Sequence, residues 1–192
     1  MDILKEKIIN EGTVIGTEIV KVDMFLNHQL DAELLDQVGA EFARRFAGIK
    51  VDRILTAEAS GIAIACLAAR HFGFPPVVFA RKKAPSTMTE EFYEAECQSF
   101  TKGTLNTLKV NKKYLPAGEN VLILDDFLAG GKATSALADI AEQADTNVVG
   151  IGVVIAKRHQ GGMDLLLSRG YNLQALAVID TITEDGQIIF ED

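Results

Sequence analysis

Short aliphatic runs alternate with amphipathic segments along most of the chain. Unbroken aliphatic runs between turn-forming residues predict buried strands, at residues 53–58, 77–80, 121–124, 147–156 and 173–180. Apolar residues at helical spacing predict helices, at about residues 2–9, 32–47, 62–72, 132–144 and 161–170. Asp31 is the expected N-cap of the second helix. Strands and helices that alternate in this way predict an α/β fold with a doubly wound, mainly parallel sheet.

Residues 84–118 break this pattern. Ser, Thr, Glu and Lys dominate there, and only short alternating pieces remain, at residues 97–101 and 107–110. A stretch of this length inside a compact domain is commonly a functional lid or a disordered segment. We therefore expect residues 1–192 to form a single domain, with residues 84–118 as a flexible flap over an active site.

Candidate chemistry begins where the strand at residues 121–124 ends. Asp125 and Asp126 follow directly, and Gly130 and Gly131 precede the next helix. Glycines allow successive backbone N–H groups to point into one concavity, and the helix adds the positive end of its dipole. Such a turn suits a phosphate, while neighbouring carboxylates suit ribose hydroxyls. The expected ligand is a ribose that carries a phosphate, although the glycines alone could form an ordinary tight turn.

Two other predicted strand ends carry possible anion-binding residues. The first is a turn of small residues and the second a basic cluster: Ala59, Ser60 and Gly61, and Arg81, Lys82 and Lys83. Ligands of open parallel sheets bind outside the carboxyl ends of the strands, so the basic cluster is interpreted as a pyrophosphate site and the small turn as a second anion site. The alternatives are a solvated strand end and a simple strand-to-helix connection.

Composition excludes several functional classes. The formal net charge of −8 argues against a nucleic-acid surface. No apolar run approaches the ~18–20 residues of a membrane span, and the N-terminus lacks the apolar core of a signal peptide, so a cytoplasmic protein is expected. Cys66 and Cys97 have no neighbours at metal-ligand spacing, and the three histidines share none, so neither a catalytic thiol nor a metal cage built by the protein is expected.

The acidic pair and the glycine turn together resemble the motif that binds 5-phosphoribosyl 1-diphosphate (PRPP) in type I phosphoribosyltransferases. The spacing fits neither a Walker loop nor a dinucleotide fingerprint. The resemblance extends to bacterial xanthine phosphoribosyltransferases over nearly the whole chain. The stretches that carry it are residues 21–29, 56–63, 78–82, 99–102, 125–129 and 150–157.

This resemblance implies a reaction, its partners and its site. The family transfers the phosphoribosyl group of PRPP to xanthine, giving xanthosine 5′-monophosphate (XMP) and pyrophosphate in purine salvage, as a homodimer, with Mg²⁺ carried by PRPP. It implies a small base-binding hood built from the N-terminal and C-terminal parts of the chain. The residues implied are Asp125 and Asp126 for catalysis, Val20, Asn27 and Lys157 for xanthine, and Ala129, Gly130, Gly131, Lys132 and Ala133 for the 5′-phosphate.

Two positions depart from the family pattern. Leucine is frequent where Val20 stands, and the phosphate turn lacks the threonine that closes it in many relatives. We hypothesise that Thr134 or Ser135 supplies the missing hydroxyl and that Lys132 adds charge.

Three alternatives stay open. Asn27 and Lys157 are hydrogen-bond donors that match the oxygens of xanthine, but guanine and hypoxanthine share the 6-oxo group. A PRPP-sensing regulator would keep the binding turn without catalysis, and would normally need an added DNA-binding segment, which this acidic chain does not show. In the third alternative, the acidic pair only caps a helix in an unrelated α/β protein.

Overall fold

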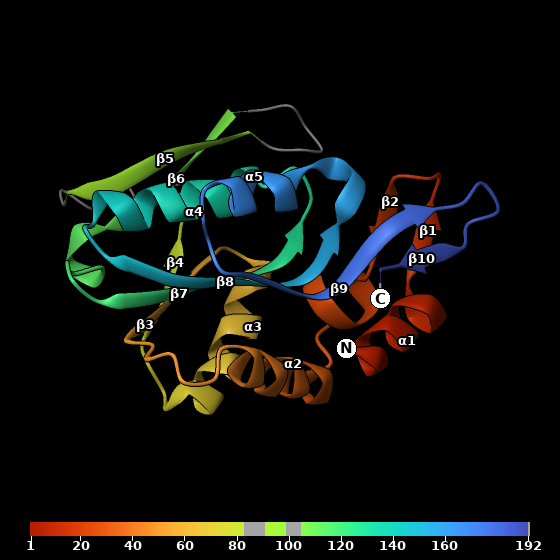
Figure 1. The fold of residues 1–192 in the computed structure, drawn as a ribbon, viewed down its shortest axis with the longest axis horizontal. Helices are drawn as coiled ribbons and strands as arrows, with labels where there is room; N and C mark the ends of the chain where they lie inside the picture. Colours follow the sequence, from red (N-terminus) through yellow and green to blue (C-terminus); the bar gives the residue numbers. More distant parts are fainter. Residues whose placement is uncertain (83–90, 99–104, 192) are drawn as a thin grey trace.

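A six-stranded sheet in the order β10-β9-β8-β7-β3-β4 forms the centre of the computed structural model, which describes residues 1–82, 91–98 and 105–191 (Figure 1). Its strands are β3 Arg53–Ala57, β4 Val77–Ala80, β7 Asn120–Leu128, β8 Asn147–Lys157, β9 Leu173–Ile182 and β10 Ile188–Phe190. All neighbours are parallel except β10, which pairs antiparallel with β9. The predicted mainly parallel α/β sheet is therefore confirmed.

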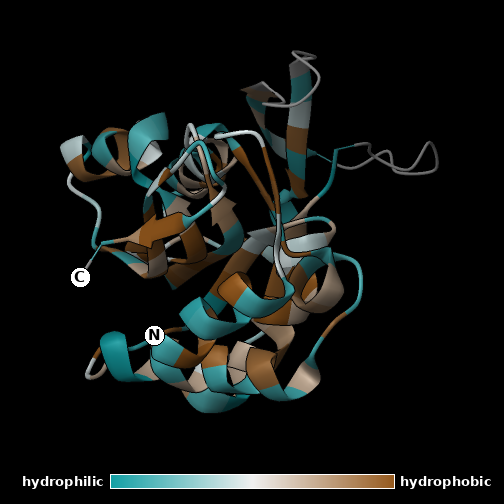
Figure 2. Cartoon of the chain, turned by 90° about the vertical axis from the view of Figure 1, so that its right-hand side faces the viewer, coloured by the Kyte–Doolittle hydropathy of each residue, from teal (hydrophilic) through white to brown (hydrophobic). Residues whose placement is uncertain are grey.

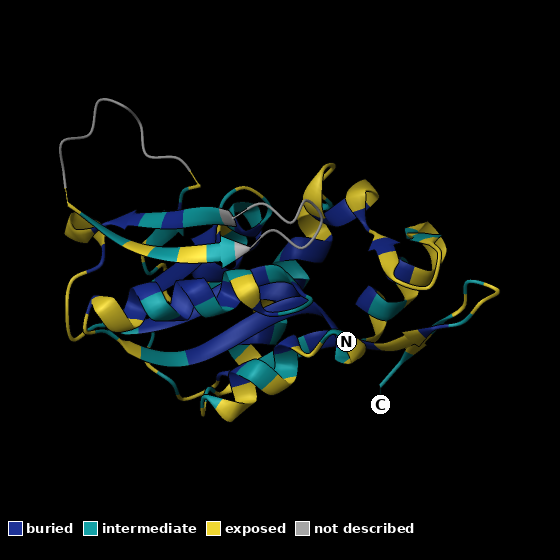
Figure 3. Cartoon of the chain, turned by 90° about the horizontal axis from the view of Figure 1, so that it is seen from above, coloured by how far each residue is buried: buried dark blue, intermediate teal, exposed yellow. Residues whose placement is uncertain are grey.

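Helices cover both faces of this sheet. Helices α2 (Ala32–Arg45) and α3 (Ser60–Ala69) lie on one face, and α4 (Lys132–Gln143) and α5 (Gly162–Ser168) lie on the other (Figure 1). Strand β7 serves both layers, because alternate residues point to opposite faces: Leu122 and Leu124 pack with the first pair of helices, and Ile123 with the second. The central strands are accordingly largely buried and hydrophobic (Figures 2 and 3).

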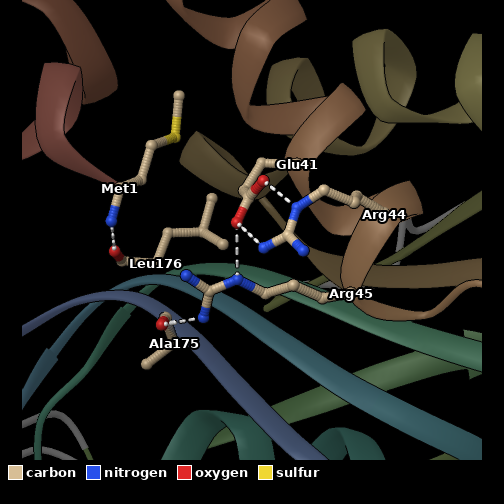
Figure 4. Close-up of polar contacts among 6 residues, drawn as sticks. All are labelled: Met1, Glu41, Arg44, Arg45, Ala175 and Leu176. Carbon is tan, nitrogen blue, oxygen red and sulfur yellow. Dashed lines mark hydrogen bonds and ion pairs between the residues drawn. The ribbon is translucent and has the colours of Figure 1, made fainter.

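Charged groups fasten helix α2 and the N-terminus to β9 (Figure 4). Glu41 accepts hydrogen bonds from Arg44 Nε at 2.8 Å and Arg45 Nε at 2.9 Å. These hydrogen bonds, Arg44 first, lower the pKa of Glu41 to about 2. Arg45 also donates to the carbonyl of Ala175 at 2.7 Å, and the Met1 ammonium donates to the carbonyl of Leu176 at 2.8 Å.

The N-terminal and C-terminal parts of the chain meet at one end of the sheet (Figure 1). The N-terminal part consists of helix α1 (Asp2–Glu11), a hairpin of β1 (Thr13–Ile15) and β2 (Ile19–Lys21), and the π-helix Asp23–Asn27. Lys5 Nζ donates to the carbonyl of Glu191 at 2.8 Å, which joins α1 to the C-terminal strand region. Asp31 accepts from the Leu34 N–H at 3.0 Å, so the predicted N-cap of α2 is confirmed. The two terminal parts from which a base-binding hood was predicted therefore lie together, and the hood itself stays a prediction.

A two-stranded antiparallel ribbon occupies much of the stretch for which we expected only short pieces. Its strands are β5 (Phe92–Gln98) and β6 (Leu105–Asn111). The alternating piece expected at residues 107–110 is confirmed within β6, whereas no strand was expected at residues 92–96. Glu94 faces Lys109 across the ribbon at 2.8 Å, while Tyr93 and Ala95 pack against the second core layer. Residues 83–90 and 99–104, where other parts of the predicted flap fall, lie outside the described residues.

Two predicted boundaries also shift. β7 does not end before the acidic pair but continues to Leu128, because Phe127 and Leu128 keep their register with Ile155 and Ala156 of β8. Helix α3 begins at Ser60, two residues earlier than predicted. Short 3₁₀ turns complete the chain, at Arg70–Phe72, Lys112–Tyr114 and Arg158–Gln160. Across the described ranges, no helix is both long and apolar enough to cross a membrane.

Candidate active site

A cavity of about 250 Å³ opens at the carboxyl ends of β3 and β7. The acidic pair and the turn that precedes α4 line it, together with residues of the β5–β6 ribbon. The lining residues outside the phosphate turn are Ala57, Glu58, Ser60, Lys82, Cys97, Asn106, Leu108, Asp125, Asp126, Phe127 and Thr134. The topology thus brings together the ends of β3, β4 and β7, which are far apart in the sequence, as expected for an open parallel sheet.

The predicted phosphate turn lines this cavity throughout. All five of its residues contribute: Ala129, Gly130, Gly131, Lys132 and Ala133. Gly131 has a φ of +74°, a left-handed conformation that glycine adopts easily, and α4 starts at the next residue. Among the described residues no side chain caps this helix end, and the first N–H groups of a helix have no intrahelical acceptor. The turn therefore has the geometry and polarity of an anion site.

The structure separates the two hydroxyls proposed to complete this turn. Thr134 is buried, lines the cavity, and its Oγ1 lies 3.5 Å from Asp125 Oδ2. Ser135 instead accepts a hydrogen bond from Arg169 NH1 at 2.7 Å and does not line the cavity. Thr134 is the hydroxyl in position to reach a bound ligand.

The acidic pair combines a buried carboxyl with a more accessible one. Asp125 is 6% exposed and accepts a hydrogen bond from the backbone N–H of Asp126 at 3.0 Å. Burial, followed by the charge of Asp126, raises the pKa of Asp125 well above its usual range. Within the described part of the chain neither carboxylate forms an ion pair. A positive charge that develops in the cavity would be stabilised by both of them.

The three residues of the turn after β3 lie in different surroundings. Ser60 lines the cavity, Ala59 is exposed outside its lining and follows a cis peptide bond, and Gly61 is buried beneath. A Cβ added at Gly61 would lie 2.0 Å from Thr56 Oγ1 and 3.6 Å from Asp125 Oδ1. Only a residue without a side chain lets α3 start this close to the acidic pair.

Substitution of Gly61 by alanine is expected to lower the free energy of unfolding by about 1–3 kcal/mol, because the new methyl group overlaps Thr56 Oγ1. Thermal and urea unfolding would measure the loss. Thr56 Oγ1 has no hydrogen-bond partner among the described residues, so Thr56→Ala makes room at little cost. The double variant should recover most of the lost stability, and two strictly additive losses would contradict the steric explanation.

The two basic residues after β4 diverge. Lys82 lines the cavity, and its backbone N–H donates to Glu58 Oε1 at 2.8 Å, which joins the ends of β3 and β4. The Arg81 guanidinium lies 5.4 Å from the centre of the Phe79 ring and lines a separate groove, so the structure does not bring it to the cavity. Neighbouring residues of an extended chain point in opposite directions, which explains the separation. Lys83 lies outside the described residues.

Two of the three residues predicted to contact a purine lie beside residues on the acidic side of the cavity, without lining the cavity themselves. Asn27 Nδ2 lies 3.5 Å from Asp126 Oδ2, and Lys157 Nζ lies 5.8 Å from the centre of the Phe127 ring. Lys157 is buried, and this burial lowers the pKa of its ammonium. The ammonium donates to the carbonyl of Glu18 at 2.7 Å. Val20, in β2, is buried in the core that includes Leu122 and Leu124, and it does not line the cavity.

Sequence reasoning missed several residues of the site. Glu58 and Phe127 adjoin predicted residues and could have been found from their positions at strand ends. Cys97, Asn106 and Leu108 reach the cavity only through the ribbon, and Glu18, which does not line the cavity, contacts Lys157 only through the hairpin connection. No local pattern in the sequence marks these four.

Comparisons with known proteins agree with this geometry. Residues 22–171 match the family model of the phosphoribosyl transferase domain. The curated xanthine phosphoribosyltransferase of Clostridium tetani is 50% identical over 191 residues, covering 100% of both chains. That of Clostridioides difficile is 48% identical over 190 residues, covering 99% of this chain and 100% of the relative.

Solved structures with lower sequence identity share the fold. An adenine phosphoribosyltransferase from Rhodothermus marinus aligns with a TM-score of 0.75 at 19% identity, covering 93% of this chain and 100% of that chain. An adenine phosphoribosyl transferase from Trypanosoma brucei, in complex with AMP, pyrophosphate and ribose-5-phosphate, aligns with a TM-score of 0.73 at 13% identity, covering 91% and 78%.

Proposed function

This chain belongs to the phosphoribosyl transferase family, and on that premise we propose that it transfers the 5-phosphoribosyl group of PRPP to N9 of xanthine, giving XMP and pyrophosphate. One observation carries the reaction: the acidic pair Asp125 and Asp126 shares a cavity with the anion-binding turn before α4. The names and full-length similarity of the curated relatives support xanthine as the base.

The cavity suggests an arrangement for PRPP. The 5′-phosphate binds the backbone N–H groups of residues 129–133, with the Thr134 hydroxyl beside them. The ribose hydroxyls donate hydrogen bonds to Asp125 and Asp126. The pyrophosphate extends toward Ser60 and Lys82, which line the same cavity. Arg81, which we also predicted to bind pyrophosphate, would need a different side-chain conformation to take part.

In the chemical step the bond from C1′ to the pyrophosphate oxygen breaks ahead of attack by N9 of the base. Positive charge then develops on the ribose, where Asp125 and Asp126 stabilise it, and negative charge develops on pyrophosphate, near Lys82. Carboxylates of Glu58, Asp125 and Asp126 line the cavity, and Mg²⁺ is usually held by one or two carboxylates together with substrate phosphates. These residues therefore suit PRPP that arrives with Mg²⁺, which would neutralise charge on the leaving group.

Base recognition rests on two donors. The Lys157 ammonium lies beside Phe127, a cavity residue, and the Asn27 amide lies beside Asp126. Both can donate to purine carbonyl oxygens, whereas the 6-amino group of adenine offers no acceptor to a lysine.

Initial rates of nucleotide and pyrophosphate formation from PRPP with xanthine, guanine and hypoxanthine test the proposal. Xanthine is expected to have the highest kcat/KM, and adenine serves as the control that should react poorly. A higher value for guanine or hypoxanthine would reassign the substrate. Binding of PRPP without pyrophosphate release from any base would instead favour the PRPP-sensing regulator.

We further propose that the protein acts as a cytoplasmic homodimer in purine salvage. The family resemblance supports the homodimer and the role in purine salvage, and the acidic net charge of −8 is compatible with small-molecule partners rather than nucleic acid. Light scattering of the purified protein would measure the oligomeric state. The flexible flap at residues 84–118 and a direct role of Val20 and Ala59 in binding stay predictions.

A further inference from the structure

The backbone of the phosphate turn rests on the backbone of another glycine. Gly162, the first residue of α5, donates its N–H to the carbonyl of Ala129 at 3.0 Å. Gly162 is buried and is not among the residues that line the cavity. The α5 helix therefore supports the turn from the side opposite the expected ligand.

No side chain fits between these two backbones. A Cβ built on Gly162 would lie 2.2 Å from the Ala129 carbonyl oxygen, 2.6 Å from the Gly131 nitrogen and 3.0 Å from the Gly130 carbonyl carbon. From the other side, a Cβ on Gly131 would lie 3.0 Å from Gly162 Cα. The neighbouring atoms are main-chain atoms, so a side-chain rotation cannot relieve the overlap.

We propose that Gly162 is a positioning residue for PRPP: it fixes the main chain of residues 129–131, so that the N–H groups of the turn converge on the 5′-phosphate. The proposal rests on the function proposed above and adds to it a residue that touches no substrate. Leu166, one turn further along α5, is buried in the core, and Arg158 before it is paired with Glu191 at 2.5 Å. Because α5 and the 3₁₀ turn before it are held by these contacts, a methyl group on Gly162 displaces the phosphate turn rather than α5.

Gly162→Ala is expected to raise KM for PRPP, and Kd for ribose 5-phosphate, by about tenfold or more, since a displacement near 1 Å of a binding group has effects of that size. KM for xanthine should stay within about twofold, because the base end is not displaced. Calorimetry with ribose 5-phosphate measures the binding effect independently of turnover.

Gly161→Asn is the matched control. Gly161 is also left-handed, with a φ of +78°, but a Cβ there meets nothing within 4 Å, and asparagine tolerates this conformation. This variant should bind ribose 5-phosphate like wild type. If it weakened binding as much as Gly162→Ala, the effect would belong to α5 in general and the proposal would fail.

A second variant keeps the test decisive if Gly162→Ala does not fold. Leu165 Cδ2 lies 3.4 Å from the Cβ position of Gly131, so Leu165→Ala loosens α5 from the turn without overlap. It should weaken ribose 5-phosphate binding about twofold to fivefold, and unchanged binding would overturn the proposal. If wild type forms nucleotide and Gly162→Ala binds ribose 5-phosphate like wild type, the role of Gly162 is refuted and the proposed function is not. Absence of turnover by wild type with every purine would refute the proposed function.

Discussion

Replacement of both Asp125 and Asp126 by asparagine is expected to lower kcat/KM for PRPP by about 10²- to 10³-fold, the usual effect of removing a charge that stabilises a transition state. Asparagine keeps the shape of both side chains, so the cavity and the phosphate turn should be unchanged. Turnover assays of the single and double variants measure the effect. Asp180→Asn, at an exposed position of β9 outside the cavity lining, is the control and should keep wild-type rates.

The same change at Asp125 should make the fold more stable at neutral pH. Burial and the neighbouring charge raise the pKa of Asp125 in the folded protein, so the folded state binds its proton more tightly than the unfolded chain does. Its ionisation therefore weakens the fold as pH rises from the unfolded pKa of about 4 through the raised folded value. The Tm of Asp125→Asn should exceed that of wild type, by a margin that grows from acidic to neutral pH.

Either of two results would contradict this assignment. Near-wild-type turnover of the double variant would show that the reaction does not need the acidic pair. A lower Tm for Asp125→Asn at neutral pH would show that the ionised carboxylate stabilises the fold.

Lys157→Gln is expected to lower kcat/KM for xanthine by about 10- to 150-fold, equivalent to the loss of a charged hydrogen bond of about 1.5–3 kcal/mol. Guanine and hypoxanthine, which share the 6-oxo group, should lose similar factors. Binding of ribose 5-phosphate should not change, because Lys157 is not among the residues that line the cavity around the phosphate turn. Equal losses for the base and for ribose 5-phosphate would indicate a general structural defect instead.

The pH profile separates the charge of Lys157 from its shape. Burial lowers the pKa of the Lys157 ammonium, so the lysine loses its charge at a lower pH than an exposed lysine does. The affinity of wild type for the base should therefore fall at that lower pH. Lys157→Arg keeps its charge throughout the alkaline range. In the Lys157→Arg variant the loss of affinity for the base should occur at a higher pH than in wild type, even if the variant is slower at every pH.

Much of this architecture could be predicted from the sequence because its signals are local. The buried strands are visible in the sequence as aliphatic runs. Particular residue types mark the other features: Asp31 the helix cap, Gly131 the left-handed turn, and the acidic pair the ligand site. The parallel topology then places the carboxyl ends of β3 and β7 at one cavity.

The remainder depends on contacts between distant residues. Tyr93 and Ala95 alternate with charged residues along β5 and pack against the core layer that contains α4. Without knowledge of that contact, β5 looked irregular in the sequence. The continuation of β7 through Asp125 and Asp126 follows from its ladder with β8. The support that Gly162 gives to Ala129, and the contact of Glu18 with Lys157, join segments whose proximity only the folded chain establishes.

The bond between the Lys157 ammonium and the Glu18 carbonyl has a consequence for selectivity. A purine oxygen that approaches this lysine competes for the positive charge of the ammonium with a carbonyl group already within the protein, so its own hydrogen bond is weaker than one to an unpaired lysine. The strength of the internal competitor depends on the conformation of the β1–β2 connection, which need not touch the base. Sequence changes in that short connection can therefore shift the preference for 6-oxopurines over adenine while every residue that contacts the base stays the same.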